Sequence, residues 1–267
     1  MMASLVALPI EPPLRAMDAA SGRRVRLPRM AEMVANELRD AILCGDLTEV
    51  PRLEDLIARF NVGPPAVREA MRILETEGLI TVRRGNVGGA DVHRPTEDRV
   101  AYMVGLVLQS KAAELADVGA ALRELEPLCA GMCAERSDRN KTVVPALRAV
   151  VAEQAAALGD HLLSIELTDR FHKTIVDSCG NETMIVVVGA LERVWAGHAS
   201  AVYRTDAPVP APAIMKASLR DHERILAAIE KGDARVAEMA AKHLDATHAY
   251  MSTVDDRRMV TAATLHL

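Results

Sequence analysis

The sequence predicts a mainly α-helical protein with two domains: three helices and a β-hairpin, followed by an all-α bundle of six or seven helices. Aromatic residues make up only 2% of the chain, while alanine, leucine, glutamate and arginine recur at helical spacing. One stretch, residues 79–92, alternates apolar and polar residues around glycines, as hairpins do. The apolar share of 50% is ample for buried cores.

Four segments are expected along the 267 residues. A flexible tail covers residues 1–27, where a glutamate and two prolines interrupt the apolar core that a signal peptide would need. The two domains cover residues 28–95 and 96–252, and a C-terminal tail covers residues 253–267. The chain has no run of 18 apolar residues, so no membrane span is expected. Four cysteines without a CxxC pair are typical of reduced thiols in a cytoplasmic protein.

The charge of the chain excludes a uniformly basic surface. Its formal net charge is −5, and residues 21–96 carry 12 arginines against 11 acidic residues. A local basic patch is compatible with these values, but charge alone does not identify a nucleic-acid-binding protein.

The first domain begins with three short helical patterns. The first pattern ends at Gly45, and its apolar stripe is Met30, Met33, Val34, Leu38, Ala41 and Ile42. The second pattern is "RLEDLIARF". The third, about residues 64–77, opens on Gly63, Pro64 and Pro65, and prolines suit a first helical turn because their φ is preset.

The third helix has two different faces. Its core face carries Val67, Ala70, Met71 and Leu74, whereas Arg68 and Arg72 lie one turn apart on another face. This like-charge pair costs a few tenths of a kcal/mol in an isolated helix, which bound phosphates would offset. The hairpin that follows carries Arg83 and Arg84 at its turn. Three helices with such a hairpin have the geometry of a winged helix-turn-helix, with the helix-turn-helix at about Leu53 to Arg72. The alternative is a solvated face on which the arginines pair with Glu69 and Glu75.

These residues resemble the GntR family of bacterial transcription regulators. The matching motifs are "LRDAILCGDL" (38–47), "VREAMRILETEGLI" (67–80) and "RRGNVGG" (83–89). The resemblance implies a homodimer that binds double-stranded operator DNA with an inverted repeat. The DNA-binding residues that it implies are Pro65, Ala66, Arg68, Arg72, Arg83, Arg84, Gly85 and Gly89, with the glycines allowing close approach to the duplex.

The chain departs from the family pattern at the start of the third helix. Family members usually carry a Ser-Arg or Thr-Arg pair where this sequence has Gly63-Pro64. Prolines lack the N–H groups that bind phosphate at a helix start, and the base-reading arginine is absent. We therefore expect a different operator sequence and weaker DNA binding with a shallower salt dependence.

The second half resembles the FCD effector domain of the FadR subfamily of GntR regulators. The matching segments are "RELEPLCAGMCAER" (123–136), "FHKTIVDSCGNETM" (171–184) and "DHERILAAIEKGDARVAEMAAKHL" (221–244). The resemblance implies a bundle that encloses a cavity for a small organic acid and binds Zn²⁺, Ni²⁺ or Mn²⁺. The implied imidazole ligands are His172, His222 and His243, and Arg123 is expected to bind the effector carboxylate. The family's acidic ligand lies four positions before the first histidine, at Thr168 here, so we expect Asp169, three positions before, to take this role. Otherwise water or the effector would complete the shell. The alternatives are hydrogen-bonded core histidines and an ion pair between Arg123 and Glu126.

The sequence thus predicts a ligand-responsive transcription regulator rather than an enzyme. A metal-dependent hydrolase is an alternative, although the sequence has no HExxH motif and no second carboxylate clearly placed as a base. A sensor module whose DNA-binding surface has decayed is another alternative, and it rests only on the Gly63-Pro64-Pro65 stretch.

Overall fold

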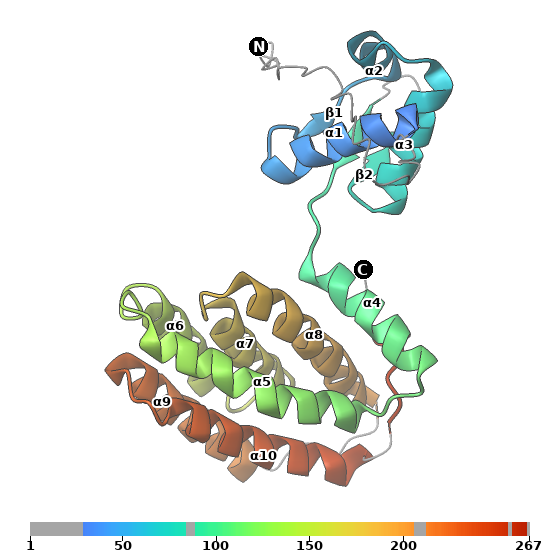
Figure 1. The fold of residues 1–267 in the computed structure, drawn as a ribbon. Helices are drawn as coiled ribbons and strands as arrows, with labels where there is room; N and C mark the ends of the chain where they lie inside the picture. Colours follow the sequence, from blue (N-terminus) through green and yellow to red (C-terminus); the bar gives the residue numbers. More distant parts are fainter. Residues whose placement is uncertain (1–28, 84–88, 206–211, 256–257, 266–267) are drawn as a thin grey trace, which may run out of the picture. The chain divides into compact units, whose positions relative to one another are not determined.

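The computed structural model describes residues 29–83, 89–205, 212–255 and 258–265, and its mainly α-helical fold confirms the predicted fold class. The chain divides into two compact units, one ending at Arg94 and the other beginning at Pro95. Each unit has its own hydrophobic core. We describe the units separately (Figure 1).

The first unit contains three helices and a small sheet. The helices are α1 (Met30–Cys44), α2 (Leu53–Phe60) and α3 (Pro64–Thr76). Helix α1 ends at Gly45, whose φ of 86° is accessible to glycine without strain. Its buried stripe omits Met30 and Met33, which are 50% and 37% exposed, so this part of the prediction was wrong. The predicted core face of α3 is buried in full.

The sheet of the first unit has three strands rather than the two that were predicted. They are β1 (Glu49–Val50), β2 (Ile80–Val82) and β3 (Ala90–Val92), in the order β1-β3-β2 with antiparallel pairing. Strand β1 has only two residues and therefore no alternation that a sequence could display. Its pairing places Glu49 opposite Asp91, so two acidic side chains lie side by side across the sheet.

The second unit is an all-α bundle of seven helices among the described residues. They are α4 (Glu97–Ser110), α5 (Leu115–Glu135), α6 (Val143–Ala156), α7 (His161–Asp177), α8 (Glu182–Thr205), α9 (Pro212–Lys231) and α10 (Val236–Asp255). Helix α5 packs against α7, α8, α9 and α10, which places it at the centre of the unit (Figure 1). The core includes Phe171, which is fully buried.

A C-terminal segment, residues 258–265, packs back onto the bundle and is not part of a tail as predicted. It contains the short 3-10 helix η1 (Ala262–Thr264), which contacts α4 and α8. The backbone N–H of Ala262 donates to the Gln109 side chain at 2.9 Å, and that of Thr261 donates to Nε2 of the buried His198 at 2.9 Å. The side chains of Val260 and Leu265 are buried in the same contact. Because the contact joins residues that are far apart in the sequence, hydrophobic periodicity could not predict it.

Candidate functional site

Helix α3 presents its two arginines to solvent, as predicted for a DNA-facing helix. The apolar residues Val67 and Leu74 are fully buried, and this fixes Arg68 and Arg72 on the opposite, exposed side. Arg72 forms an ion pair with Glu69 at 3.1 Å, while Arg68 has no ion pair with another described residue. One of the two arginines on this face is therefore neutralised, whereas Arg68 is not paired with an acid among the described residues.

The start of α3 offers few backbone donors. Gly63 is the N-cap, Pro64 and Pro65 occupy the first two helical positions, and neither proline has an N–H. The next N–H, that of Ala66, donates to the Gly63 carbonyl at 3.0 Å. Pro65 is exposed and Ala66 is half-buried, so both predicted contact residues lie at the surface. The phosphate-binding capacity that helix starts commonly have is thus reduced at this one.

The predicted wing residues are used largely within the sheet. The guanidinium of Arg83 donates to Asp91 of β3 at 2.9 Å and forms an ion pair with Glu49 of β1. It thereby neutralises the two acidic side chains that the strand register places together. Gly89 has a φ of 78°, and a Cβ there would lie 2.7 Å from the Val50 carbonyl oxygen, so strand packing alone requires this glycine. Arg84 and Gly85 lie outside the described residues.

Three histidines from three helices converge in the second unit. His172 lies on α7, His222 on α9 and His243 on α10. The Nε2 atoms of His222 and His243 are 3.0 Å apart, and those of His243 and His172 are 3.3 Å apart. Their ligand atoms all lie within 4.8 Å of one another, so the group could hold a metal ion.

The Nδ1 atom of each imidazole lies beside an oxygen from another side chain. His172 Nδ1 is 2.6 Å from Glu126, His222 Nδ1 is 2.8 Å from Gln154, and His243 Nδ1 is 3.6 Å from Asp221. Since these oxygens accept hydrogen bonds, Nδ1 of His172 and of His222 is the donor, and Nε2 keeps its lone pair. We conclude that the tautomers expose Nε2 to the centre of the cluster.

A separate hydrogen bond fixes the orientation of the Gln154 amide. Its nitrogen donates to the hydroxyl of Thr168 at 2.8 Å, and that hydroxyl donates to the carbonyl of Ser164 at 2.9 Å. The amide oxygen of Gln154 therefore faces His222. The ring of Phe171 also stacks on His222, with centroids 3.9 Å apart, which holds the ring plane.

Burial keeps two of the imidazoles neutral. It lowers the pKa of His222 well below its ordinary value and that of His243 to about 4, and the nearby imidazole of His172 lowers both further. Burial also lowers the pKa of His172, but the carboxylates of Glu126 and Asp169 together outweigh this and raise it above its ordinary value. Neutral imidazoles are the form that binds metal.

The geometry of the cluster fits a divalent metal. Two nitrogens bound to one ion at about 2.1 Å, with angles between about 90° and 109°, lie about 3.0 to 3.4 Å apart. The separations of 3.0 and 3.3 Å fall within this range. Converging lone pairs repel one another at such distances, and a cation between them would remove the repulsion. The three histidines are thus arranged as metal ligands would be, and metal binding itself stays a prediction.

Asp169 stands apart from this cluster. It is not among the residues whose ligand atoms come within 4.8 Å of one another, although it lies one turn before His172 and lines the adjoining cavities. Burial raises the pKa of its carboxyl to about 7, against an opposing effect of His172. Its role as fourth ligand remains a prediction.

Two cavities meet beside the histidines. The larger has a volume of about 1030 Å³ and is lined by Glu126, His172 and Glu192 among others; Ala263 and Thr264 of the C-terminal segment also line it. The smaller, of about 150 Å³, is lined by Ser218, Asp221 and His243. The two share Asp169 and Trp195 in their walls. A ligand in either cavity would lie next to the imidazole cluster.

Arg123 lies away from both cavities. Its side chain is 45% exposed, and its guanidinium contacts Asp245 of α10 at 3.4 Å and Glu124 at 4.0 Å. Arg123 is not among the residues that line either cavity, and the alternative pair with Glu126 does not form, because Glu126 is buried and bonded to His172 instead. The placement of Arg123 therefore does not support its predicted role.

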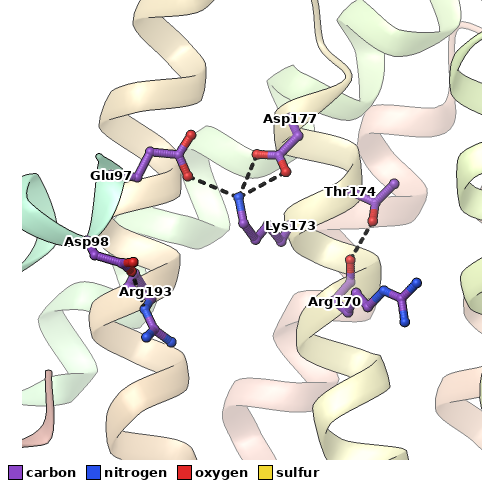
Figure 2. A network of polar contacts seen from close by, with 7 residues as sticks. All are labelled: Glu97, Asp98, Arg170, Lys173, Thr174, Asp177 and Arg193. Atoms are coloured by element: carbon purple, nitrogen blue, oxygen red, sulfur yellow. Dashed lines mark hydrogen bonds and ion pairs between the residues drawn. The ribbon is translucent and has the colours of Figure 1, made fainter. Parts of the chain in front are cut away.

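The cations that do line the large cavity are each paired with an acid. Figure 2 shows Lys173 of α7 between Glu97 of α4, at 3.0 Å, and Asp177 of α7, at 2.8 Å. Asp98 of α4 accepts from Arg193 of α8 at 2.6 Å. The first turn of α4 is thus attached to two helices of the cavity wall.

Sequence reasoning missed the residues that orient the histidines. Glu126 and Gln154 lie on α5 and α6, 46 and 68 positions from the imidazoles that they contact. Buried acids and amides are uncommon in a core, but a sequence does not show that a residue is buried. Of the residues beside the imidazoles, only Asp221 could have been suspected from the sequence, because it directly precedes His222.

Comparison with known proteins agrees with both units. The model of "Bacterial regulatory proteins, gntR family" matches residues 30–87, and that of the FCD domain matches residues 117–246. A solved GntR protein of Streptococcus agalactiae superposes with a TM-score of 0.62 at 21% identity, covering 82% of this chain and 99% of that one. At this identity the likeness shows the fold alone.

Curated relatives match over a shorter part. The HTH-type transcriptional repressor NanR of Klebsiella aerogenes is 39% identical over 75 residues, which are 27% of this chain and 28% of that one. NanR of Cronobacter sakazakii is 36% identical over 89 residues, or 32% and 34% of the two chains. The chain thus aligns with about a third of the length of these relatives. None of the described helices has the length and apolar character that a membrane crossing needs. The chain belongs to the GntR family of transcription regulators, in the group that carries an FCD domain.

Proposed function

We propose that this regulator is a repressor that binds operator DNA as a homodimer and is controlled by a small acid bound at a metal centre in its FCD domain. The repressor sense is carried over from the names of the NanR relatives. DNA binding is supported by the exposed face of α3, where Arg68 has no partner among described residues. The three converging Nε2 atoms are the observation that carries the metal centre.

The proposed metal is Zn²⁺, Ni²⁺ or Mn²⁺, held by His172, His222 and His243. Imidazole ligands suit these ions, and Asp169 is a candidate for a fourth position. When bound, such a metal supplies a positive charge and open positions for a carboxylate. The chain's own part is to orient the imidazoles through Glu126 and Gln154 and to enclose the acid in the large cavity.

The effector signal is proposed to pass through α4. Lys173 and Arg193 line the cavity and also bind Glu97 and Asp98 in the first turn of α4. An acid that competes for these cations would loosen the attachment of α4, which directly follows the DNA-binding unit in the chain. Coupling then requires that the acid bind the loosened arrangement better than the attached one. Each exposed ion pair contributes only about 0.2 to 1 kcal/mol, so modest binding energy suffices.

In a homodimer, two copies of α3 would read the two halves of an inverted repeat. Half-sites read by paired helices of this kind are separated by about one helical turn of DNA, or a multiple of it. Loosening of α4 would change the separation of the two reading units. This would lower operator affinity without any change at α3 itself.

A genomic DNA pull-down with metal-loaded protein, with and without a panel of carboxylates, tests the proposal. We expect enrichment of a few inverted repeats, and release of these fragments by at least one acid. Metal content of the purified protein, measured by mass spectrometry, should approach one ion per chain. Turnover of phosphoesters by metal-loaded protein that retains no DNA would contradict the proposal and favour the hydrolase interpretation.

A further inference from the structure

Two side chains that line the cavities have buried polar atoms without a hydrogen-bond partner. Both carboxylate oxygens of Glu192 and the hydroxyl oxygen of Ser218 are in this state, and within the described chain no other buried side-chain oxygen or nitrogen is. Glu192 lines the large cavity and Ser218 the small one. Buried polar groups are nearly always hydrogen-bonded in folded proteins, so each exception calls for an explanation. Both exceptions belong to cavity walls, where a bound molecule could reach them.

Glu192 on α8 has no cation within ion-pair distance among the described residues. Burial raises the pKa of its carboxyl well above the ordinary value, and the nearby carboxylate of Glu126 raises it further. Lys173 acts in the opposite direction but is already bonded to Glu97 and Asp177. The carboxylate is therefore costly to ionise unless a positive donor is brought to it.

The charges around the large cavity favour the same kind of ligand. Seven carboxylate side chains line it, against the three cations Arg170, Lys173 and Arg193. Each cation is in an ion pair, with Arg170 held by Glu153 at 2.7 Å. A ligand with only negative groups would face an excess of acids, whereas one with a positive group would be attracted by them.

We infer that Glu192 binds an ammonium group of the effector, so that the effector is a zwitterion of the amino-acid type, with its carboxylate directed to the histidine centre. This inference rests on the acid binding proposed for the cavity. An ammonium donates up to three hydrogen bonds and can satisfy both oxygens of Glu192. A hydroxyl can donate only one, and it leaves the carboxylate charge uncompensated.

Calorimetry with matched ligands tests the inference on full-length protein loaded with one equivalent of Zn²⁺. The probes are L-glutamate, 2-hydroxyglutarate and glutarate, L-alanine and propionate, and 6-aminohexanoate and hexanoate. In at least one set the amino member should bind about 10- to 100-fold more tightly than its partner without nitrogen, as expected for a charged hydrogen bond. We call this ratio of the two affinities the amino gap. The variant Glu192→Gln should reduce the gap several-fold or more while leaving the binding of the nitrogen-free acid nearly unchanged.

Glu182→Gln is the matched control, because it removes the same charge from an exposed position on the same helix. The gap should persist in this variant. A gap that is equally large in Glu192→Gln would overturn the inference and leave the metal-bound acid in place. Nitrogen-free acids that bind wild-type protein as tightly as their amino partners would also overturn it, even if the variant failed to fold. If no acid binds the metal-loaded wild type, both the inference and the proposed effector binding fail.

Discussion

The exposed face of α3 and the buried histidine cluster are opposite ways of presenting groups to a ligand. On α3, Arg68 has no partner among described residues and Arg72 has one exposed ion pair. In the cluster, the Nδ1 atoms of His172 and His222 are hydrogen-bonded and that of His243 lies near Asp221. The arginines are exposed and have few contacts within the protein, whereas the imidazoles are held in position by their neighbours.

This difference predicts how each site responds to change. A preorganised site loses affinity steeply when one member or its support is removed, because the remaining groups are fixed for that arrangement. A flexible cationic face loses affinity gradually, since each contact contributes separately and salt screens it.

The largest effect is expected for His222→Ala. Loss of a fully buried ligand should lower metal affinity by more than about 100-fold, since loss of a supporting residue alone typically costs about 10- to 100-fold. Competition with a metal-binding dye measures this, and thermal melts with and without metal confirm that the variant folds. His161→Ala, outside the cluster, should bind metal as wild type does. Unchanged affinity of His222→Ala would remove the basis for the metal centre.

Glu126→Gln tests whether the carboxylate that contacts His172 contributes to metal affinity. The amide still reaches His172 but carries no charge, so metal affinity should fall by about 10- to 100-fold. Glu135→Gln on the same helix is exposed and should have no effect. Equal metal affinity in both variants would mean that the carboxylate only fills space in the core.

Arg68→Ala should weaken operator binding by about 1 to 3 kcal/mol if the side chain reads a base, and less if it contacts phosphate. Arg83→Ala provides the contrast, because its guanidinium is occupied by Asp91 and Glu49. We expect it to lower thermal stability while changing DNA affinity less than Arg68→Ala does. Fluorescence anisotropy with labelled operator and thermal melts separate the two effects, and a larger DNA defect in Arg83→Ala would reverse the assignment.

Pro64→Arg should have the smallest effect, and it sharpens the account of the helix start. Restoring the usual arginine adds one cation per chain, so the slope of log affinity against log salt should steepen by about 1.8 per dimer. Pro65→Ala, which restores an N–H without a charge, is the control. A wild-type slope already as steep as that of an arginine-bearing relative would show that no contact is missing.

Local patterns predicted the fold class and the faces of α3, because apolar residues at helical spacing form one side of a helix, and that side packs on the core. The buried Val67, Ala70, Met71 and Leu74 lie where the periodicity places them. The histidines were found through resemblance to a family and not through spacing, since they lie on three separate helices. The residues that orient the histidines could not be predicted, because Glu126 and Gln154 contact them from other helices of the bundle. The ion pairs of Arg83 could not be predicted either, because they depend on the strand register that places Glu49 opposite Asp91.

The C-terminal segment also sets an order of events during synthesis. Its bond from Ala262 to Gln109 joins residues 153 positions apart, and contacts of such separation form late. Domains generally fold in turn as the chain emerges, N-terminal first. The first unit can therefore fold completely before Ala263 and Thr264 take their places in the wall of the large cavity. Under the proposed function, the unit that would read DNA is therefore complete before the cavity that would bind the effector.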